Sequence, residues 1–402
     1  MTQATGVAFT ARRTDDFRLI GGVSAAHFIS HFYLLVLPPL FIFVRADYAV
    51  SYTELGLALT ALNGVSAVLQ THAGMLVDRV NARLVLVAGI ALGAVALAIA
   101  AAVDSFWVLI AMFALLGVAN TVYHPADYAL LSRHVAPERM SQAYSVHSFA
   151  GMLGSAATPG SVLFLQGLFG WRGAFLGAAA FGFVIAAVLL FQRDGEPTHA
   201  PAKPHAAATG SNWSLLFSAP IMANFMFFML LAFCGFGLQN FTVVALGALY
   251  GTTAVTANAA LTGYLALSAL GVLIGGWIAG RIAGHRLAVS LGMLTTVAAV
   301  VLIGSVDLGT LLLIAVMSLS GLCSGMVMPS RDMIVREVTP PGAFGRVFGF
   351  VTNGFNIAGI IAPLIFGAML DHGAPRAMFF AIAVFALLSI FTVVSVPKRR
   401  AA

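Results

Sequence analysis

Charged residues are scarce in this sequence. The chain of 402 residues has 20 Lys and Arg, 14 Asp and Glu, and a mean hydropathy of +0.98. A soluble domain carries about 25% charged residues, whereas only 8% of the residues here are charged and 60% are hydrophobic. The low charge excludes a soluble fold of this size and predicts a chain that lies mostly in lipid.

Cysteine is also scarce. The two cysteines, Cys234 and Cys323, both lie within apolar stretches. Two separated cysteines inside apolar helices do not form a disulfide framework, and we expect both to be small buried packing residues. The cysteines therefore do not indicate whether the protein lies in an oxidising or a reducing compartment.

Sequence motifs for ATP-driven work or catalysis are missing. No loop of the G-x-x-x-x-G-K-[ST] type is present, and this disfavours transport driven by ATP. No sizeable segment outside the apolar stretches carries a catalytic group of residues. We therefore expect no cofactor and no enzymatic activity. An intramembrane enzyme or a sensor is the rival class, and it would need a catalytic cluster or an attached soluble domain.

Long apolar stretches are abundant. A helix that spans a bilayer needs about 20 apolar residues, and eleven charge-free stretches meet that requirement. The longest has to contain two spans, with a turn near Tyr250-Gly251-Thr252. The sequence therefore predicts an all-α membrane protein with twelve transmembrane helices. The stretches are 19–44, 55–77, 84–103, 105–126, 140–171, 173–192, 204–280, 287–306, 308–330, 347–370 and 377–397.

Lys and Arg are distributed unevenly over the predicted loops. Cytoplasmic loops retain positive charge, and an even number of spans puts both termini on one side. Termini placed inside leave sixteen of the 20 basic residues in the cytoplasm. We predict an integral protein of the plasma (inner) membrane with both termini cytoplasmic. The net charge of +6 then reflects this topology and the anionic inner leaflet, so the expected partner is the lipid bilayer and not a nucleic acid.

Residues 193–214 break the apolar pattern. The segment is rich in Pro, Ala, Thr and Gly, which is typical of a flexible linker. Its His199 and His205 have no Cys or carboxylate at ligand spacing, so we expect no metal site there. The linker divides the chain into two six-helix bundles, 1–192 and 215–402.

The two halves align with each other at an offset of 204 residues through the fourth to sixth predicted spans of each. Chance rarely keeps so many Gly and Pro in register. Two similar bundles around a site at the membrane midplane are the arrangement of secondary transporters, in which one bundle rocks against the other. The matching pairs are Gly117/Gly321, Pro125/Pro329, Pro137/Pro341, Pro159/Pro363, Arg172/Arg376 and Phe175/Phe379.

The turn after the second predicted span carries a motif. Residues 74–83, GMLVDRVNAR, resemble the G-x-L-x-D-R-x-G-R-K signature of the major facilitator superfamily. We expect Gly74 to permit tight packing, Asn81 to adopt the left-handed backbone that Gly usually supplies, and Arg79 and Arg83 to be cytoplasmic anchors. The resemblance implies that Asp78 latches the two halves in the outward-open state.

A second resemblance covers most of the first half. Its segments 27–33, 51–53 and 117–125 are similar to the fosmidomycin-resistance branch of the superfamily, whose members are proton-linked drug exporters. That branch usually carries Asp where this chain has His31, and Glu where it has Ala126 or Asp127.

The fifth predicted span adds a third resemblance. Residues 151–160 resemble the antiporter motif through Gly151, Gly154 and Pro159, with Thr158 in place of the Gly before Pro. The resemblance implies proton-coupled efflux. A proton-coupled uptake symporter for a carboxylate or related metabolite is the alternative.

Two histidines lie one turn apart on the first span, His27 and His31. At about 1.5 Å per residue, His31 lies roughly 18 Å from the start of the span, near the midplane. A histidine there can bind an anion when it is protonated and release it when neutral. The alternative is a hydrogen bond to a neighbouring helix. The pair is not expected to hold a metal, because no third ligand is evident.

Other polar residues are expected to line the same cavity. Asn120, His124 and Asp127 fall on one face of the fourth span, and His147 lies on the fifth. At the repeat offset Asp127 corresponds to Arg331, so we hypothesise a cytoplasmic gate formed by this charge pair. The alternative is interfacial snorkelling, with Arg331 paired locally to Asp332 or Glu337.

These patterns predict a secondary transporter that moves a small organic solute by alternating access, with protons as the coupling partner. The His and Arg content of the predicted cavity favours an anionic solute, because fixed positive groups offset the desolvation of negative charge. We expect the transporter to be a monomer.

Overall fold

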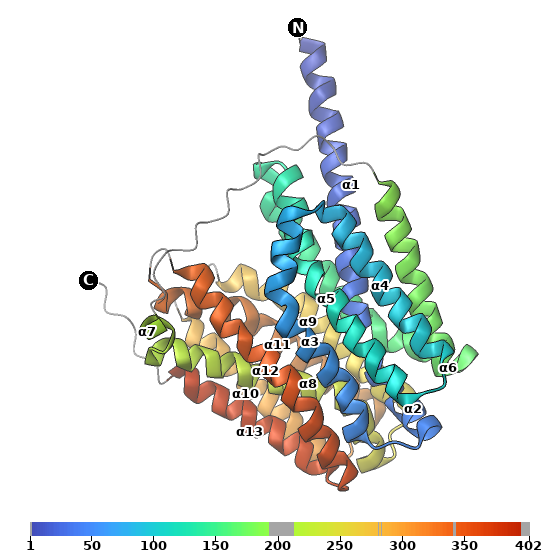
Figure 1. Cartoon of the computed structure of the whole chain (residues 1–402). Helices are drawn as coiled ribbons and strands as arrows, with labels where there is room; N and C mark the ends of the chain where they lie inside the picture. The colour runs from blue at the N-terminus through green and yellow to red at the C-terminus, as the bar shows by residue number, and fades with distance from the viewer. Residues whose placement is uncertain (1, 193–212, 280, 283, 341–342, 395–402) are drawn as a thin grey trace. The chain divides into compact units, whose positions relative to one another are not determined.

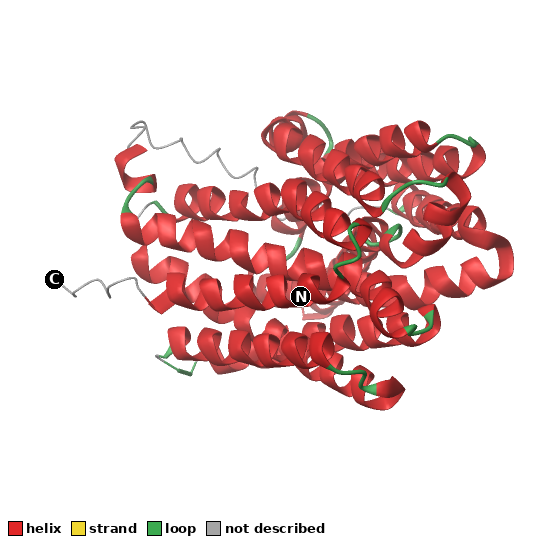
Figure 2. Cartoon of the chain, turned by 90° about the horizontal axis from the view of Figure 1, so that it is seen from below, coloured by secondary structure: helices red, strands yellow, loops and turns green. Residues whose placement is uncertain are grey.

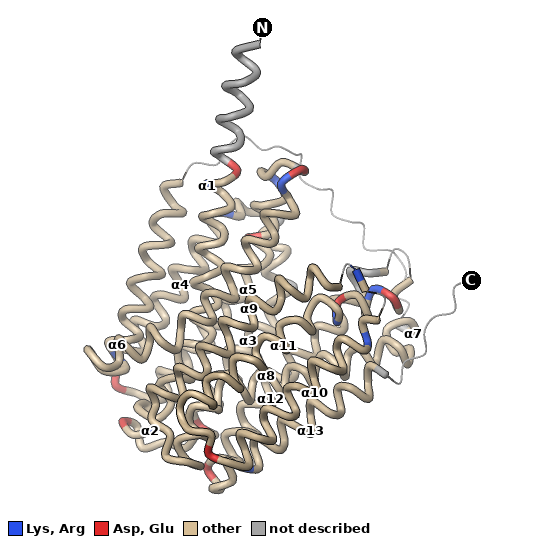
Figure 3. The backbone as a smooth tube through the Cα atoms, turned by 180° about the vertical axis from the view of Figure 1, so that it is seen from behind, with Lys and Arg blue, Asp and Glu red and all other residues tan. Residues whose placement is uncertain are grey.

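The structure is a computed structural model that describes residues 2–192, 213–279, 281–282, 284–340 and 343–394. Helices dominate this part of the chain, and no strand occurs in it (Figure 2). The charged residues that are described gather mainly near the ends of the helices (Figure 3). The apolar helices with charged ends are those expected of a membrane protein.

The first half contains long helices with local breaks that the sequence explains (Figure 1). Helix α1 ends before Pro38 and Pro39, whose rings and missing N–H groups disfavour helix continuation. The elements are α1 (Thr2–Leu34), η1 (Pro38–Leu40), α2 (Phe41–Tyr48), α3 (Tyr52–Arg79), α4 (Ala82–Ala102), α5 (Phe106–His134), η2 (Pro137–Arg139) and α6 (Met140–Phe191).

The second half begins with a short helix and continues with six long ones. The predicted turn near Tyr250 is confirmed, because α8 ends at that residue and Gly251 takes the left-handed conformation with φ 68°. The elements are α7 (Trp213–Leu216), α8 (Ala219–Tyr250), α9 (Ala254–Ala279), α10 (His285–Ser305), α11 (Gly309–Val338), α12 (Phe344–Asp371) and α13 (Pro375–Val394).

The twelve predicted spans are confirmed. Ten helices of the described residues are long and apolar enough to cross a membrane. One of them, α6, has 52 residues, about 78 Å at 1.5 Å per residue, and Gly170 breaks it with φ 71° and ψ 176°. It therefore contains two spans. The remaining span is α3, whose 28 residues include the polar Asn63, Gln70 and His72 and are less apolar than the ten.

The chain forms two compact units. Unit 1 is Met1–Val36, Val65–Ser155 and Leu165–Gly210, and unit 2 is Leu37–Gly64, Ala156–Phe164 and Ser211–Ala402. Two segments of the first half, 37–64 and 156–164, thus group with the second half. Of the predicted linker, 193–212 lies outside the described residues. The grouping of 37–64 has a local cause in unit 2, where Thr60 donates to the Ile360 carbonyl at 2.8 Å.

Helices α4 and α5 pack side by side within unit 1 (Figure 1). A Cβ on Gly93 would lie 2.8 Å from the ring of Tyr33. The hydroxyl of Tyr123 donates to the Gly89 carbonyl at 3.2 Å. The small-residue pair Gly89/Gly93 therefore makes room for two buried tyrosines.

Helices α9 and α11 pack closely within unit 2. A Cβ on Gly275 would lie 2.7 Å from the backbone of Met326, and one on Gly321 would overlap the Tyr264 carbonyl. Gly117, the repeat equivalent of Gly321, also lies at a helix contact in unit 1, where its carbonyl accepts a hydrogen bond from Ser66 of α3 at 3.0 Å. The internal repeat therefore preserves close helix contacts.

Candidate functional site

Four histidines and one aspartate from three helices meet inside unit 1. Helix α1 supplies His27 and His31, α5 supplies His124 and Asp127, and α6 supplies His147. All five were predicted as cavity or gate residues from the sequence. We call this group the His–Asp cluster.

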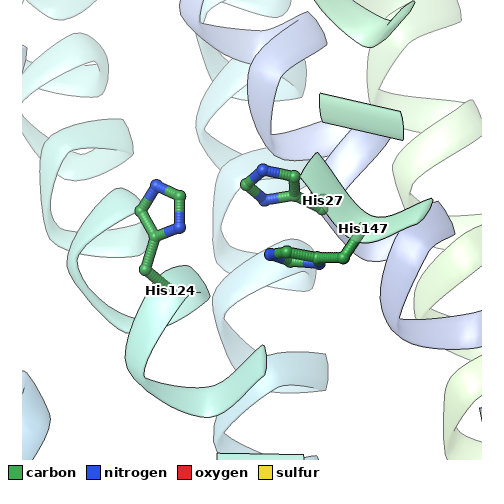
Figure 4. A group of neighbouring side chains, drawn as sticks. All are labelled: His27, His124 and His147. Atoms are coloured by element: carbon green, nitrogen blue, oxygen red, sulfur yellow. The ribbon is translucent and has the colours of Figure 1, made fainter. Parts of the chain in front are cut away.

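His27 lies at the centre of the cluster. Its ring stacks on the ring of His147, with centroids 3.9 Å apart and an interplanar angle of 27°. The His31 ring lies 4.6 Å away and the His124 ring 4.9 Å away, both edge-on. Figure 4 shows the rings of His27 and His147 one above the other, with His124 nearby on a third helix.

Asp127 is fully buried beside these rings. Its Oδ2 lies 3.5 Å from Nδ1 of His27 and 3.8 Å from Nε2 of His147, while Asp127 is 0% exposed, His147 1% and His27 4%. A carboxyl group in such a place is either protonated and neutral or compensated by a nearby positive charge, because an isolated buried charge is costly.

Several buried polar atoms of the cluster have no hydrogen-bond partner among the described residues. They are Nδ1 of His27, both ring nitrogens of His147 and both carboxylate oxygens of Asp127. Such an atom costs about 1–3 kcal/mol when it stays unsatisfied. These nitrogen and oxygen atoms of the cluster can chemically accept a proton or bind an ion.

One side of the cluster is accessible. His124 and Tyr128 are exposed along α5, and the Tyr128 ring lies 5.5 Å from His147 and 5.4 Å from Tyr144. His31 is half-buried, with its Nδ1 3.1 Å from the hydroxyl of Ser155. The inter-helix hydrogen bond that was the alternative for His31 is thus present, while its place in the cluster agrees with the functional interpretation.

The predicted polar stripe of α5 divides between two environments. The Asn120 amide donates to the hydroxyl of Ser66 on α3 at 3.2 Å, whereas Asp127 turns into the cluster. His124 is the exposed member of the stripe. The helical periodicity therefore predicted that the three residues share one face of α5. Which neighbours each residue contacts depends on the packing of the helices.

Glycines of α6 allow α1 to come close to the cluster. A Cβ on Gly151 would overlap the imidazole of His27, and one on Gly154 would overlap the Phe28 carbonyl. Pro159 is buried further along α6, in the segment that belongs to unit 2. The first two residues of the antiporter-like motif thus have a direct structural role, whereas the motif's part in exchange stays a prediction.

Two expectations for the signature at 74–83 are wrong in detail. Apart from its own helix backbone and chain neighbours, no heavy atom of the described residues lies within 4 Å of a Cβ built on Gly74, so this glycine is not tightly packed there. Asn81 has φ −61° and ψ 114°, an extended conformation, and its side chain accepts hydrogen bonds from the backbone N–H groups of Arg83 and Leu84. Asn81 is therefore the N-cap of α4 and not a left-handed residue, because its side chain satisfies N–H groups of the first turn.

The other residues of the signature differ in exposure. Arg79 is exposed, as expected of an anchor, but Arg83 is buried and donates to the Leu189 carbonyl near the end of α6 at 3.4 Å. A cation at a helix C-terminus is stabilised by the helix dipole. The side chain of Asp78 lies outside the described residues, and its latch role stays a prediction.

Arg331 has local partners in unit 2. Its Nε donates to Asp332 at 2.8 Å, and its guanidinium lies 4.5 Å from the centre of the Phe228 ring. This is the local pairing that we gave as the alternative. The gate between Asp127 and Arg331 stays a prediction.

The sequence did not predict that three histidines able to bind a metal ion lie close together. The nitrogens of His27, His124 and His147 lie within 4.8 Å of one another. The sequence did not indicate that α5 and α6 bring two more imidazoles to His27. The expectation that the His27/His31 pair holds no metal stays a prediction. Tyr128 was also missed, although its four-residue spacing from His124 places both on one face of α5.

Comparison with known proteins gives a family match over most of the chain. The model of the Major Facilitator Superfamily matches residues 23–254 and 225–402. A curated relative, "Probable nitrate/nitrite transporter NarK2" of Mycobacterium tuberculosis, is 26% identical over 343 residues, which cover 81% of this chain and 82% of the relative. The relative from a second strain of that organism matches equally.

Solved structures show the same fold. A bacterial homologue of the human lysosomal transporter Spinster, in an inward-facing and unoccupied conformation, aligns with a TM-score of 0.74 and 13% identity over 97% of this chain and 99% of that one. The nucleoside transporter NupG aligns with a TM-score of 0.76 and 15% identity over 94% and 99% of the two chains. At these identities the likeness concerns the fold alone.

Proposed function

This chain belongs to the Major Facilitator Superfamily, and on that premise we propose that it is a proton-coupled transporter of a small anion that works by alternating access. The observation that carries the proposal is the His–Asp cluster, in which Asp127 and His147 are fully enclosed and His27 almost so. Ionisable groups at membrane depth are costly and usually belong to a substrate or proton path.

The cluster supplies groups that can carry the proton. An imidazole changes charge near neutral pH, at about 6.5 in its unperturbed form. Asp127 is within 4 Å of a ring nitrogen of both His27 and His147, so a proton bound to one of the three alters the charge that the other two face. His124 and His31 connect this group to the accessible side.

Two observations support an anionic solute. Protonated imidazoles at His31 and His124 would present positive charge beside the hydroxyl group of Ser155 and the ring of Tyr128. The relative from Mycobacterium tuberculosis is named as a nitrate/nitrite transporter. Nitrate and nitrite are therefore the first solutes to test, followed by small carboxylates.

Efflux is the direction that we favour. The resemblance of residues 151–160 to the antiporter motif supports it, and Gly151 and Gly154 of this segment leave room for the histidine-bearing part of α1. A member of the fosmidomycin-resistance branch would export its solute in exchange for protons. Proton-coupled uptake of a carboxylate or related metabolite, on the same residues, is the alternative.

The proposal places the protein as a monomer in the plasma (inner) membrane with both termini in the cytoplasm. The excess of Lys and Arg in loops on the side of the termini supports this orientation. In that orientation Asp78 and Arg79 belong to a cytoplasmic turn, where the latch role applies.

The test is transport by the purified protein in liposomes. Nitrate, nitrite, a panel of small carboxylates and a panel of organic cations are each offered with and without a pH gradient. We expect anion flux that the gradient drives, and loss of the pH-driven part in His31→Ala. His72→Ala, an exposed histidine of α3 outside the cluster, is the matched control and should keep its flux. Full proton-driven flux in His31→Ala would reject the assignment.

Direction and gate need separate measurements. Flux in right-side-out and inverted vesicles under one imposed pH gradient distinguishes efflux from uptake. For the gate, we expect Asp127→Arg and Arg331→Asp each to abolish flux and the double variant to recover part of it. No recovery would reject the pair in favour of the local Arg331–Asp332 contact.

A further inference from the structure

We propose that His27, His124 and His147 form a binding site for a divalent first-row transition-metal ion, with Asp127 as the carboxylate that orients the ligands. The inference goes beyond the proposed transport function and does not depend on it. It is carried by the number, kind and spacing of the ligands.

The ligands have the right number and spacing. Three imidazoles from α1, α5 and α6 place nitrogens within 4.8 Å of one another. Nitrogens around a tetrahedral zinc ion, each about 2.0–2.1 Å from the metal, lie roughly 3.4 Å apart. Side-chain rotations and small helix shifts are enough to close the difference.

The lone pairs of two ligands are available. Nδ1 of His27 and both nitrogens of His147 are buried without a hydrogen-bond partner among the described residues. Nδ1 of His27 and Nε2 of His147 face Asp127, so a metal ion would bind the other nitrogen of each ring, Nε2 of His27 and Nδ1 of His147. The rings of His27 and His147 are stacked, so their lone pairs run side by side, and one ring has to turn for the two to converge.

Asp127 lies on the buried side of the three histidines and can orient their rings. Its Oδ2 lies 3.5 Å from His27 and 3.8 Å from His147, the placement in which a carboxylate accepts a ring N–H and fixes the orientation of a histidine ligand. The negative charge also offsets part of the charge of a divalent ion. A bound cation is one way to offset the cost of a buried Asp127 carboxylate.

The ligand set selects the class of metal. Imidazole ligands suit zinc, cobalt, nickel and copper, whereas calcium and magnesium prefer oxygen ligands. His124 lies on the exposed side, so an ion would enter there and keep an open coordination position for water or an anion. A bound ion would also join α1, α5 and α6.

The test uses tag-free, metal-depleted full-length protein in detergent, with cobalt(II) as the spectroscopic probe and zinc(II) as the competitor. We expect one cobalt ion per chain with the visible absorption of a tetrahedral site, displaced by zinc. His27→Ala, His124→Ala and His147→Ala should each weaken binding at least 100-fold, and Asp127→Asn about 10–100-fold. His31→Ala, in the cluster but outside the ligand set, should keep the spectrum.

A variant that gains a signal is needed as well, because an alanine variant could lose cobalt binding only by folding poorly. His124→Cys replaces an exposed ligand with a thiol that also binds these metals, and its cobalt complex should gain a thiolate-to-cobalt charge-transfer band over the parent protein. His72→Cys should gain none. Absence of cobalt binding to the parent, or binding that all three alanine variants retain, would overturn the proposal.

Metal binding and transport can fail independently. Cobalt binding without anion flux would leave the metal site standing and remove the proposed transport function. Anion flux without cobalt binding would support the proposed transport function and remove the metal site. His31→Ala separates them within one variant, because it should lose proton-driven flux and keep the cobalt spectrum.

Discussion

Asp371, at the end of α12, holds the first turn of α3 through Thr53. Its Oδ2 accepts hydrogen bonds from the Thr53 backbone N–H at 2.8 Å and from the Thr53 hydroxyl at 2.6 Å, and its Oδ1 accepts from the N–H of Tyr52 at 2.8 Å. These N–H groups have no partner inside their own helix, and a carboxylate there is favoured by the helix dipole. A residue of the second half thus caps a helix of the first.

Removing this carboxylate should loosen the start of α3. We expect Asp371→Ala to destabilise the protein by about 1–2 kcal/mol, the size of a lost N-terminal cap, and Asp371→Asn to lose less because an acceptor oxygen remains. Thermal unfolding in detergent measures both effects. A cysteine at Thr53 should also react faster with a maleimide in the Asp371→Ala background. Equal reactivity in both backgrounds would contradict the capping role.

Adding one methyl group at Gly151 should disturb the His–Asp cluster. The new Cβ of Gly151→Ala would overlap the His27 imidazole and push α1 away from α6. We expect flux and cobalt binding to fall at least tenfold, while the melting temperature changes little. Gly21→Ala on α1 is the control and should behave like the parent, because no atom of another described part of the chain lies within 4 Å of the added Cβ. Normal cobalt binding in Gly151→Ala would show that the ring moves freely.

Two adjacent glycines of α9 offer a matched pair for the packing of unit 2. A Cβ on Gly275 would lie 2.7 Å from the Met326 backbone, whereas the nearest atom to one on Gly276 is Cγ of Pro329 at 4.0 Å. Overpacking of this kind costs about 1–3 kcal/mol. Gly275→Ala should therefore lower the melting temperature while Gly276→Ala leaves it unchanged. Equal melting temperatures would mean that α9 and α11 separate without cost.

Asn81 distinguishes a cap from a left-handed turn. As the N-cap of α4 it accepts two backbone N–H groups, so Asn81→Ala should cost about 0.5–2 kcal/mol, while Asn81→Asp should keep most of the stability. At a left-handed position Asn81→Gly would stabilise the protein. At a cap it costs a few tenths of a kcal/mol. Thermal unfolding of the three variants decides between the two, and higher stability of Asn81→Gly than of the parent is the outcome that contradicts the cap.

The sequence by itself determined the number of spans and their approximate ends. Whether a stretch of chain enters a bilayer depends on its own hydropathy and length, which are local properties. The turn at Gly251 and the break before Pro38 are local as well, because each follows from the backbone preference of single residues. Helical periodicity likewise placed His27 with His31, and His124 with Asp127, on shared faces.

Only the tertiary structure decided which of these faces meet. His147 stacks on His27 because Gly151 and Gly154 let α6 approach α1, and nothing in the periodicity of either helix sets their rotation about each other. The same holds for Asp127, whose partners are histidines of two other helices, and for Asp371, which lies 318 residues from Thr53 in sequence. Contacts between helices depend on the shapes of both surfaces together, so a pattern read along one helix predicts the face but not its partner.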